Sequence, residues 1–415
     1  MSVRAGIIVT GTEVLSGIIR DANGPWLSEA LRARGVVVSH IVVVGDRPDD
    51  LRSALDFLSD HDLVLTSGGL GPTADDLTAD VVAEWAGAEL VHDPALEERI
   101  WAVVSRLRRR MPFEEEAMRA GARKQALVPV GAAVLEPVGT APGLLVPSSG
   151  PLVGVLPGPP RELQTMWDAA VTTSPLRELL ESAGSLEQRI LRFFPLPEPQ
   201  IAATLREIGD VPFEVTTCLR RGELEVATVF PPGEAAAYSS FEAELRARHG
   251  DVLFSDDGAT IDEVIARLLL SGGLTIATAE SCTGGLMAGR LTDLAGSSAY
   301  VLGGLTVYSN EAKTALAGVP APLIEAHGAV SPEVATALSA GARARLGADI
   351  GIGITGIAGP GGGSEAKPVG TVCISVSSAS DAEERTVRLP GGRADIRDRT
   401  TTVTLHMLRA LLLRA

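Results

Sequence analysis

The sequence predicts a multidomain α/β protein, and three observations lead to that prediction. The chain has 415 residues, more than one ordinary core accommodates, so two or three domains are expected. Hydrophobic residues make up 45% of the sequence and aromatic residues only 4%, which suits Val/Ile/Leu strands and Ala/Leu helices. Short apolar runs alternate with segments of helical spacing in the first and last thirds, as in parallel sheets covered by helices.

The first third shows this alternation clearly. The β-branched run 36–44 predicts a buried parallel strand. Ligands of such sheets bind beyond the carboxyl ends of the strands. Those ends are followed here by residues 11–13, 45–46 and 67–78. The expected elements of this part are strands at 5–10, 36–44 and 63–66 and helices at 23–34 and 51–58.

The segment from about 175 to 257 has a different character, because prolines interrupt it repeatedly. We expect a small α+β domain here, acting as a spacer or in dimerisation. Its expected elements are strands at 213–219 and 224–230 and helices at 198–208 and 235–249.

From residue 260 the α/β pattern returns. Gly303-Gly304 lies inside an expected strand and indicates a bulge or a close backbone approach. The expected elements are strands at 274–279, 300–308, 350–355 and 370–377 and helices at 261–270, from 286, at 332–346 and at 400–413.

The charge balance excludes some classes of partner. The net charge of −16 disfavours nonspecific binding to nucleic acid, because a polyanion would be repelled.

Three dispersed cysteines form no CxxC pair and favour a reducing compartment. The first residues lack the pattern of a signal peptide, and no apolar run approaches the roughly 20 residues of a membrane span. We therefore expect a cytoplasmic protein without membrane association.

Lysine is rare in this chain: three lysines stand beside 33 arginines. A desolvated ammonium can lose its proton and act as a base, whereas a guanidinium cannot. Lys124, Lys313 and Lys367 are therefore candidates for functional amines, although chance survival in an Arg-biased chain would leave the same pattern.

Residues 279–285, Ala-Glu-Ser-Cys-Thr-Gly-Gly, follow an expected strand and precede an expected helix. This arrangement presents Ser281 at a helix N-terminus, where main-chain N–H groups can hold an oxyanion or a phosphate. Alternatively, Ser281 or Thr283 simply caps the helix. Cys282 is a rival nucleophile, but no histidine accompanies it nearby.

Residues 308–313, Tyr-Ser-Asn-Glu-Ala-Lys, form another strand-to-helix junction. Ser309 or Asn310 would cap the helix, which leaves Lys313 in its first turn. A cation there opposes the helix dipole, and partial burial would lower its pKa further. A lysine of lowered pKa is what a Ser–Lys general base requires. A surface lysine is the alternative.

A long glycine-rich loop follows the strand that contains Thr355. Such loops allow close approach of a ligand and expose N–H donors, although the order of a P-loop is absent. Lys367 closes the loop and would hold it or contact a ligand. Arg393, Arg397 and Arg399 are candidates for a phosphate clamp, or for ordinary surface charge.

A second glycine-rich turn, at 67–73, follows a buried strand near the amino terminus. It would cradle an anion, and the adjacent carboxylates of Asp75 and Asp76 suit Mg²⁺ bound together with phosphates. Glu13 and Asp46 follow other strands and are further metal candidates. An ordinary glycine turn before an Asp-rich helix start is the alternative. The loops 139–143 and 156–162 are expected to line the same ligand site, and Arg106–Arg110 to form a solvated helical face.

The carboxyl-terminal motifs AESCTGG, YSNEAK, TGIAGPGGGSEAKPVGTV and GGRADIR strongly resemble the CinA carboxyl-terminal domain. The amino-terminal motifs resemble the molybdopterin-binding fold of the MoaB/MogA type in its CinA branch. This resemblance implies a three-layer α/β/α molybdopterin-binding-like domain at 1–172, a small α+β, KH-like domain at 173–257 and an α/β CinA domain at 258–415.

The resemblance also implies an activity for the carboxyl-terminal domain, the hydrolysis of nicotinamide mononucleotide (NMN) to nicotinate mononucleotide and ammonia. Ser281 would be the nucleophile, Lys313 the general base, Tyr308 its partner, and Thr355 an aid in positioning or proton transfer. Family members often carry Asp-Arg where this chain has Gly392-Arg393, which leaves phosphate contacts there less certain. The residues expected around the substrate are Thr283, Gly284, Gly285, Asn310, Gly356, Gly361, Gly362, Lys367, Arg393 and Arg397.

For the amino-terminal domain the resemblance implies either pterin binding by descent or metal-dependent hydrolysis of ADP-ribose to AMP and ribose 5-phosphate. Mg²⁺ is the expected cofactor there, with Asp76, Asp75, Asp46 and Glu13 as ligands, and no cofactor is expected at the carboxyl-terminal site. A homodimer is expected. The expected substrate contacts are Gly68, Gly69, Gly71, Thr73, Lys124, Thr140, Gly158 and Arg161.

A hypothesis from another functional class, a binding protein rather than an enzyme, stays open. The chain would then be a non-catalytic pterin- or nucleotide-binding protein, acting in competence or the DNA-damage response through a partner such as a recombinase. Its acidity does not favour direct binding to nucleic acid.

Overall fold

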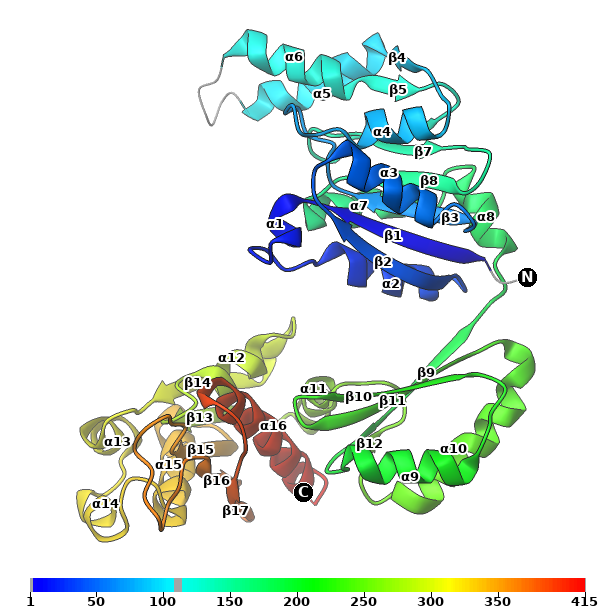
Figure 1. Cartoon of the computed structure of the whole chain (residues 1–415). Helices are drawn as coiled ribbons and strands as arrows, with labels where there is room; N and C mark the ends of the chain where they lie inside the picture. The colour runs from blue at the N-terminus through cyan, green and yellow to red at the C-terminus, as the bar shows by residue number, and fades with distance from the viewer. Residues whose placement is uncertain (1–2, 108–113, 415) are drawn as a thin grey trace. The chain divides into compact units, whose positions relative to one another are not determined.

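The computed structural model describes residues 3–107 and 114–414. Arg108–Arg110 of the expected basic helical face lie outside these ranges. Contacts divide the chain into two compact units, each with its own sheets (Figure 1). Unit 1 comprises residues 1–188 and 230–233, and unit 2 comprises 189–229 and 234–415.

Unit 1 is built on a six-stranded sheet in the order β2-β1-β3-β8-β7-β6 (Figure 1). The strands β2, β1, β3 and β8 are parallel, so they end at one edge of the sheet, whereas β7 is antiparallel to both of its neighbours, β8 and β6. The strand bounds are Arg4–Thr10 for β1, Val37–Val44 for β2, Leu63–Ser67 for β3, Ala133–Leu135 for β6, Gly143–Val146 for β7 and Leu152–Leu156 for β8.

Helices cover both faces of this sheet, because successive residues of its strands point to opposite sides. Ile7 packs in the cluster that contains α2 (Asn23–Arg32), α7 (Pro160–Ala170) and α8 (Leu176–Ser182). Ile8 packs in the cluster that contains α3 (Pro48–Phe57) and α4 (Thr78–Trp85). The three-layer α/β/α prediction is therefore confirmed. The remaining elements are α1 (Thr12–Leu15), α5 (Pro94–Leu107), α6 (Glu115–Gln125), β4 (Leu90–His92) and β5 (Leu127–Pro129).

The prediction of a buried strand at 36–44 is wrong in one respect. Strand β2 is parallel, but it lies at the edge of the sheet, and most of its residues are exposed or half-buried. A continuous β-branched run is typical of central strands, and periodicity alone does not tell a central strand from an edge strand.

Unit 2 begins with a four-stranded sheet in the order β10-β11-β9-β12. Strands β10 and β11 form an antiparallel hairpin whose turn is Arg221-Gly222, with both residues at positive φ. The predicted α+β composition of the middle segment is present. Its elements are β9 (Glu187–Phe193), α9 (Glu198–Ile208), β10 (Glu214–Arg220), β11 (Glu223–Phe230), η1 (Pro232–Glu234), α10 (Ala235–His249) and β12 (Leu253–Ser255).

The second sheet of unit 2 has the order β14-β13-β15-β16-β17, with β14, β13 and β15 parallel and β16 antiparallel to both of its neighbours, β15 and β17. One face packs against α11, α12 and α16, and the other against α13, α14 and α15. The strands are β13 (Ile276–Glu280), β14 (Val301–Thr306), β15 (Ile350–Gly356), β16 (Thr371–Ser377) and β17 (Ala382–Arg388). The helices are α11 (Ile261–Gly272), α12 (Leu286–Thr292), η2 (Ser297–Ala299), α13 (Asn310–Ala317), α14 (Ala321–His327), α15 (Pro332–Leu346) and α16 (Arg393–Leu412).

The Gly303-Gly304 prediction is confirmed in both of its forms. The register between β13 and β14 shifts directly before Gly303, between the pairs Ile276–Val301 and Ala277–Gly303. A Cβ at Gly304 would lie 2.7 Å from Thr278 Oγ1 and 2.8 Å from Ala288 Cβ, so helix α12 packs closely on this strand.

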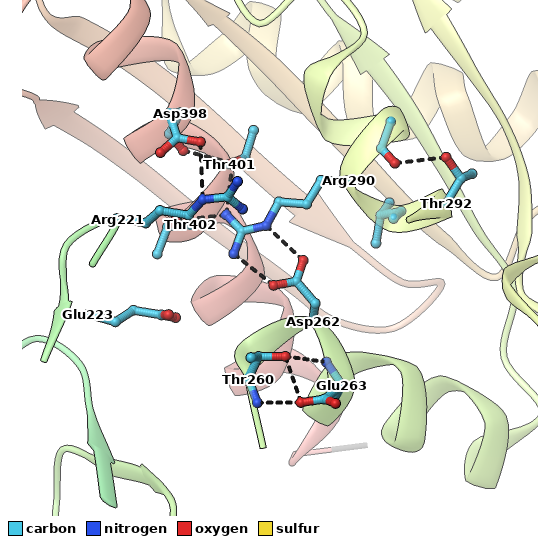
Figure 2. A network of polar contacts seen from close by, with 12 residues as sticks. Arg221, Glu223, Thr260, Asp262, Glu263, Arg290, Thr292, Asp398, Thr401 and Thr402 are labelled. Carbon is cyan, nitrogen blue, oxygen red and sulfur yellow. Dashed lines mark hydrogen bonds and ion pairs between the residues drawn. The ribbon is translucent and has the colours of Figure 1, made fainter. Parts of the chain in front are cut away.

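Side-chain contacts join the middle sheet of unit 2 to helix α16 (Figure 2). At the hairpin turn, Arg221 Nε lies 3.5 Å from Asp398 Oδ1. One residue after the turn, a carboxylate oxygen of Glu223 lies 2.7 Å from His406 Nε2, and both side chains are buried. The His406 ring also stacks on Phe194, with centroids 3.8 Å apart and planes 7° apart. The two sheets of unit 2 therefore share a packed junction.

No helix among the described residues is both long and apolar enough to cross a membrane.

Candidate functional sites

Ser281 lies in the turn that follows β13, at the edge where β13, β14 and β15 end. Its side chain is only slightly exposed, and its N–H donates to the carbonyl of Ile354 on the neighbouring strand. The main chain of the turn is thus anchored to the sheet.

The capping alternative for Ser281 and Thr283 is wrong, because Glu280 takes that role. The N-cap residue of α12 is Gly285, without a side-chain cap of its own. The buried carboxylate of Glu280 accepts the N–H groups of Gly285 and Met287 at 3.0 Å and of Ala288 at 2.8 Å. These donors of the first turn are therefore not available to an oxyanion.

Lys313 is buried, with 2% of its surface exposed, and its Nζ faces Ser281. Nζ lies 3.2 Å from Ser281 Oγ, 3.1 Å from the carbonyl oxygen of Val307 and 3.2 Å from that of Tyr308. Burial lowers the pKa of the Lys313 amine. No ion pair between Lys313 and a carboxylate occurs among the described residues. Desolvation therefore favours the unprotonated amine.

The junction that carries Lys313 forms as expected. Ser309 caps α13 by accepting the N–H of Ala312 at 3.1 Å. Tyr308 contributes its carbonyl to the lysine, but its side chain is 63% exposed and turns elsewhere. Its hydroxyl accepts Arg393 Nη2 at 3.3 Å. The expected partnership between Tyr308 and the lysine is therefore a main-chain contact.

Two other expected residues hold loops rather than facing the serine. Thr355 is fully buried and donates to the carbonyl of Ala329 at 2.6 Å. Lys367 Nζ donates to the carbonyls of His327 and Val330, at 3.1 and 2.7 Å. The structure thus gives both residues positioning contacts with the segment between α14 and α15.

The arginines at the start of α16 reach two neighbouring loops. Arg393 Nη1 donates to the carbonyl of Gly359 in the glycine-rich loop at 2.9 Å. Arg397 Nη2 donates to the carbonyl of Thr283 at 2.7 Å, and a Cβ on Gly284 would lie 3.5 Å from the same Nη2. Of the other expected contacts, Gly285 and Gly356 are half-buried, whereas Asn310, Gly361 and Gly362 are exposed.

Cys282 does not compete as a nucleophile in this arrangement. Its side chain is buried, and burial raises the pKa of the thiol to about 11. The thiolate, which is the reactive form, is therefore disfavoured at neutral pH.

Unit 1 contains a cavity of about 520 Å³ at the carboxyl ends of its parallel strands. That volume is in the range of small-ligand pockets. Predicted residues that line it are Glu13, Asp46, Gly68, Gly69, Gly71, Asp75, Asp76, Thr140 and Gly158.

Threonines hold three of the carboxylates of this cavity, those of Asp46, Asp75 and Asp76. Asp46 accepts both the N–H and the hydroxyl of Thr12, at 2.8 and 2.9 Å. Thr73 donates its hydroxyl to Asp75 and Asp76. Among the described residues, no group of three or more His, Cys, Asp or Glu side chains is arranged to hold a metal ion. Mg²⁺ usually takes one or two carboxylates and completes its shell with water and substrate phosphates. The donor set here fits an ion of that kind.

Three predicted residues do not line this cavity. Thr73 supports the aspartates from the adjacent turn, and Lys124 Nζ donates to the Thr73 carbonyl. Lys124 borders a smaller adjoining cavity together with Gly69, Gly71 and Asp76. Arg161 is exposed on α7.

Comparison with known proteins extends over both units. Sequence models of the CinA C-terminal domain and of a probable molybdopterin binding domain match residues 258–412 and 6–177. The CinA-like protein of Mycolicibacterium paratuberculosis is 54% identical over 432 residues, covering 99% of each chain. That of Mycolicibacterium gilvum is 56% identical over 421 residues, again covering 99% of each chain.

The chain belongs to the CinA family. The predicted family and the α/β fold class are confirmed.

Solved structures of CinA proteins match parts of the chain. The competence/damage inducible protein CihA from Agrobacterium tumefaciens is 41% identical, with a TM-score of 0.36, and the match covers 38% of this chain and 99% of that one. CinA from Thermoplasma acidophilum is 32% identical, with a TM-score of 0.36 and coverage of 41% and 97%.

Sequence reasoning missed residues of both sites in this CinA chain. In unit 1, Asn23 lines the cavity and ties two of its loops together, donating Nδ2 to Ser67 Oγ at 2.8 Å and to the Gly158 carbonyl at 2.7 Å. Glu162, which lies in the loop 156–162 predicted to line the ligand site, lines the cavity as well. In unit 2, Glu280 is the missed residue. An acid directly before a Ser-x-x-Gly-Gly helix start could have indicated it, since carboxylates are favoured at helix N-termini.

Proposed function

We propose that the carboxyl-terminal part of this CinA protein deamidates NMN, with Ser281 as nucleophile and Lys313 as general base. One observation carries the proposal: a buried lysine amine lies 3.2 Å from the hydroxyl of a serine at the carboxyl edge of a parallel sheet. Nucleophilic catalysis needs a base within hydrogen-bond reach and a pKa near the working pH. Lys313 meets the distance requirement, and burial moves its pKa in the required direction.

The reaction then proceeds in two stages. Neutral Lys313 takes the hydroxyl proton while Ser281 Oγ attacks the carboxamide carbon. The tetrahedral intermediate collapses, its carbon–nitrogen bond breaks, and the nitrogen leaves as ammonia with the proton from Lys313. Water then attacks the acyl-serine, Lys313 again takes a proton, and nicotinate mononucleotide leaves as Ser281 regains its hydrogen. This is the general course of acyl transfer through a covalent intermediate.

The oxyanion needs donors other than the first turn of α12, because Glu280 occupies those. Among the described residues, the N–H groups of Cys282 and Thr283 donate to no oxygen of the chain, so this pair is our candidate. Arg393 and Arg397, which border the glycine-rich loop and the serine turn, are our candidates for the substrate phosphate.

Ammonia release from NMN tests this proposal. The wild-type chain should release ammonia with EDTA present, because the Ser–Lys step needs no metal. Ser281→Ala and Lys313→Met should each lower kcat about 10³-fold or more. Ser271→Ala, which changes an exposed serine on α11, is the matched control and should leave kcat unchanged.

Lys313→Arg sharpens the test. It keeps a cation but removes the titratable amine, so it should be nearly as inactive as Lys313→Met. Absence of ammonia release by the folded wild type would overturn the proposal. It would also favour the other class of function, a pterin- or nucleotide-binding protein that acts through a protein partner.

For unit 1 we propose hydrolysis of ADP-ribose to AMP and ribose 5-phosphate. The observation that favours it is a cavity of about 520 Å³ that combines a glycine-rich turn with several carboxylates. Gly68 and Gly69 have positive φ, and a Cβ at either position would crowd Thr10 or Thr78. Side-chain-free backbone of this kind lets a diphosphate approach N–H groups closely. Mg²⁺ bound with the diphosphate would offset its charge, with Asp76, Asp75, Asp46 and Glu13 as candidate ligands.

Formation of AMP from ADP-ribose, with and without EDTA, tests the second activity. We expect EDTA to abolish it and added Mg²⁺ to restore it, while ammonia release by unit 2 stays constant. AMP formation that is unchanged by EDTA would refute the metal requirement. We also propose that the chain is a homodimer, which sedimentation at micromolar concentration can test.

A further inference from the structure

Glu162 is a cavity residue whose position no structural contact explains. It lies in the first turn of α7, lines the cavity of unit 1 and is half-buried. Its main-chain N–H donates to the carbonyl of Pro159. Its carboxylate makes no hydrogen bond or ion pair with any other residue that the structure describes.

The aspartates that line the cavity, in contrast, accept hydrogen bonds from the chain. Asp21 accepts the N–H groups of Asn23 and Gly24, and Asp46 accepts Thr12. Asp75 and Asp76 accept the hydroxyl of Thr73, as described above. Glu13 resembles Glu162 in making no such bond, but Glu13 is exposed. Glu162 therefore combines partial burial with a free carboxylate.

Gly139, which precedes the cavity residue Thr140, leaves room for this carboxylate. A Cβ on Gly139 would overlap the carboxyl group of Glu162, so any residue other than glycine at position 139 would displace it. Gly139 needs no unusual backbone conformation, since its φ lies outside the left-handed range. Space for the Glu162 carboxyl group is thus the role that the structure offers for this glycine.

We propose that Glu162 is the general base of unit 1, and this inference rests on the ADP-ribose hydrolysis proposed above. Glu162 would accept a proton from the attacking water as the water oxygen bonds to one phosphorus of the diphosphate. The bond between that phosphorus and the bridging oxygen then breaks. AMP and ribose 5-phosphate leave, and Glu162 returns its proton to solvent.

Electrostatics agree with this role. Burial raises the pKa of Glu162, which brings it nearer to the working pH of a base. A carboxylate in the first turn of a helix is also stabilised by the helix dipole. That stabilisation would be the same without the cavity and without Gly139, so it explains neither feature. The other charged side chains that line the cavity are Glu13, Arg20, Asp21, Asp46, Asp75 and Asp76.

The experiment measures AMP formation from ADP-ribose and Mg²⁺ by the full chain across pH. Glu162→Gln should lower kcat about 10²-fold or more while KM changes less than about twofold. The wild-type profile should fall on the acid side, as the base becomes protonated, and Glu162→Gln should lack that fall. Asp168→Asn, an exposed acid on the same helix, is the control and should behave as wild type.

Two further variants separate a chemical role from a structural one. Glu162→Ala should regain part of its activity in added formate, because a small carboxylate can occupy the vacated space. Gly139→Ala, which keeps Glu162 but displaces its carboxyl group, should lower kcat between the wild-type and Glu162→Gln values. Glu162→Asp offers a conservative replacement if Glu162→Gln does not fold.

The outcomes distinguish this inference from the function on which it rests. An active wild type together with a Glu162→Gln variant of similar kcat overturns the inference alone. A folded Glu162→Ala variant that formate does not restore also overturns it. A wild type that forms no AMP, while it still releases ammonia from NMN, overturns both the inference and ADP-ribose hydrolysis.

Discussion

Replacing Glu280 by alanine should loosen the turn that carries Ser281. The carboxylate accepts the N–H groups of Gly285, Met287 and Ala288 and the hydroxyl of Thr278. The fully buried N–H of Met287 would cost about 1–3 kcal/mol when left unpaired, and the two half-buried groups would cost less because water reaches them. We expect the first turn of α12 to open more easily by about 3 kcal/mol, or about 100-fold.

Hydrogen exchange of peptides that cover residues 283–290 measures this opening directly. Glu280→Gln keeps one accepting oxygen and should give about half the free-energy change. Glu325→Ala, at an exposed position on α14, is the control. Exchange in Glu280→Ala within about threefold of wild type would refute the reasoning, since the carboxylate would then not be what holds the turn. We also expect slower ammonia release, because the same turn holds Ser281.

Three other variants test unit 2. Lys313→Met should abolish deamidation and yet raise the thermal midpoint, because burial makes the charged form of the lysine unfavourable in the folded state. For the same reason, kcat of the wild type should rise with pH through a pKa below the ordinary lysine value. An unchanged midpoint would contradict this. Gly341→Ala should destabilise the unit by about 1–3 kcal/mol, since its Cβ would overlap the Ala317 carbonyl, and a denaturant midpoint equal to wild type would contradict that close packing. Arg290→Lys should cost about 2–3 kcal/mol, because the two parallel bonds from the guanidinium to Asp262, at 2.7 and 2.9 Å, cannot both form (Figure 2); exchange rates across α11 report it.

Much of the fold could be predicted because the apolar periodicity of each segment and the prolines and glycines that flank it indicate the same element. Helices α9, α10 and α15 have the bounds that apolar spacing and flanking prolines or glycines predicted. Helix α16 begins at Arg393 rather than at Thr400, because its first turns are polar and contribute little to the apolar period. The exposure of β2 could not be predicted, since the order of strands in a sheet depends on long-range packing.

The site could be predicted where reactive side chains follow directly after the end of a strand. Ser281 and Lys313 come from separate junctions, yet parallel neighbouring strands bring those junctions to one edge. Contacts between side chains and distant carbonyls were not predictable. Thr355 reaches Ala329 and Lys367 reaches Val330, and no local pattern encodes such pairs. Glu162 falls in a loop that was predicted to line the site, but a role of its own could not be predicted, because only the cavity distinguishes it from an ordinary acid in a first helical turn.

The packed junction between the β10–β11 hairpin and α16 affects where the chain can be cut to make recombinant fragments. A recombinant fragment that starts at 258, where the family match begins, would lack Phe194 and Glu223 and leave the His406 ring without its stacking and hydrogen-bonding neighbours. We expect such a fragment to express poorly or to associate through that newly opened surface. A fragment that starts at 189 keeps the junction whole, and a polar replacement at position 406 should make the shorter fragment soluble.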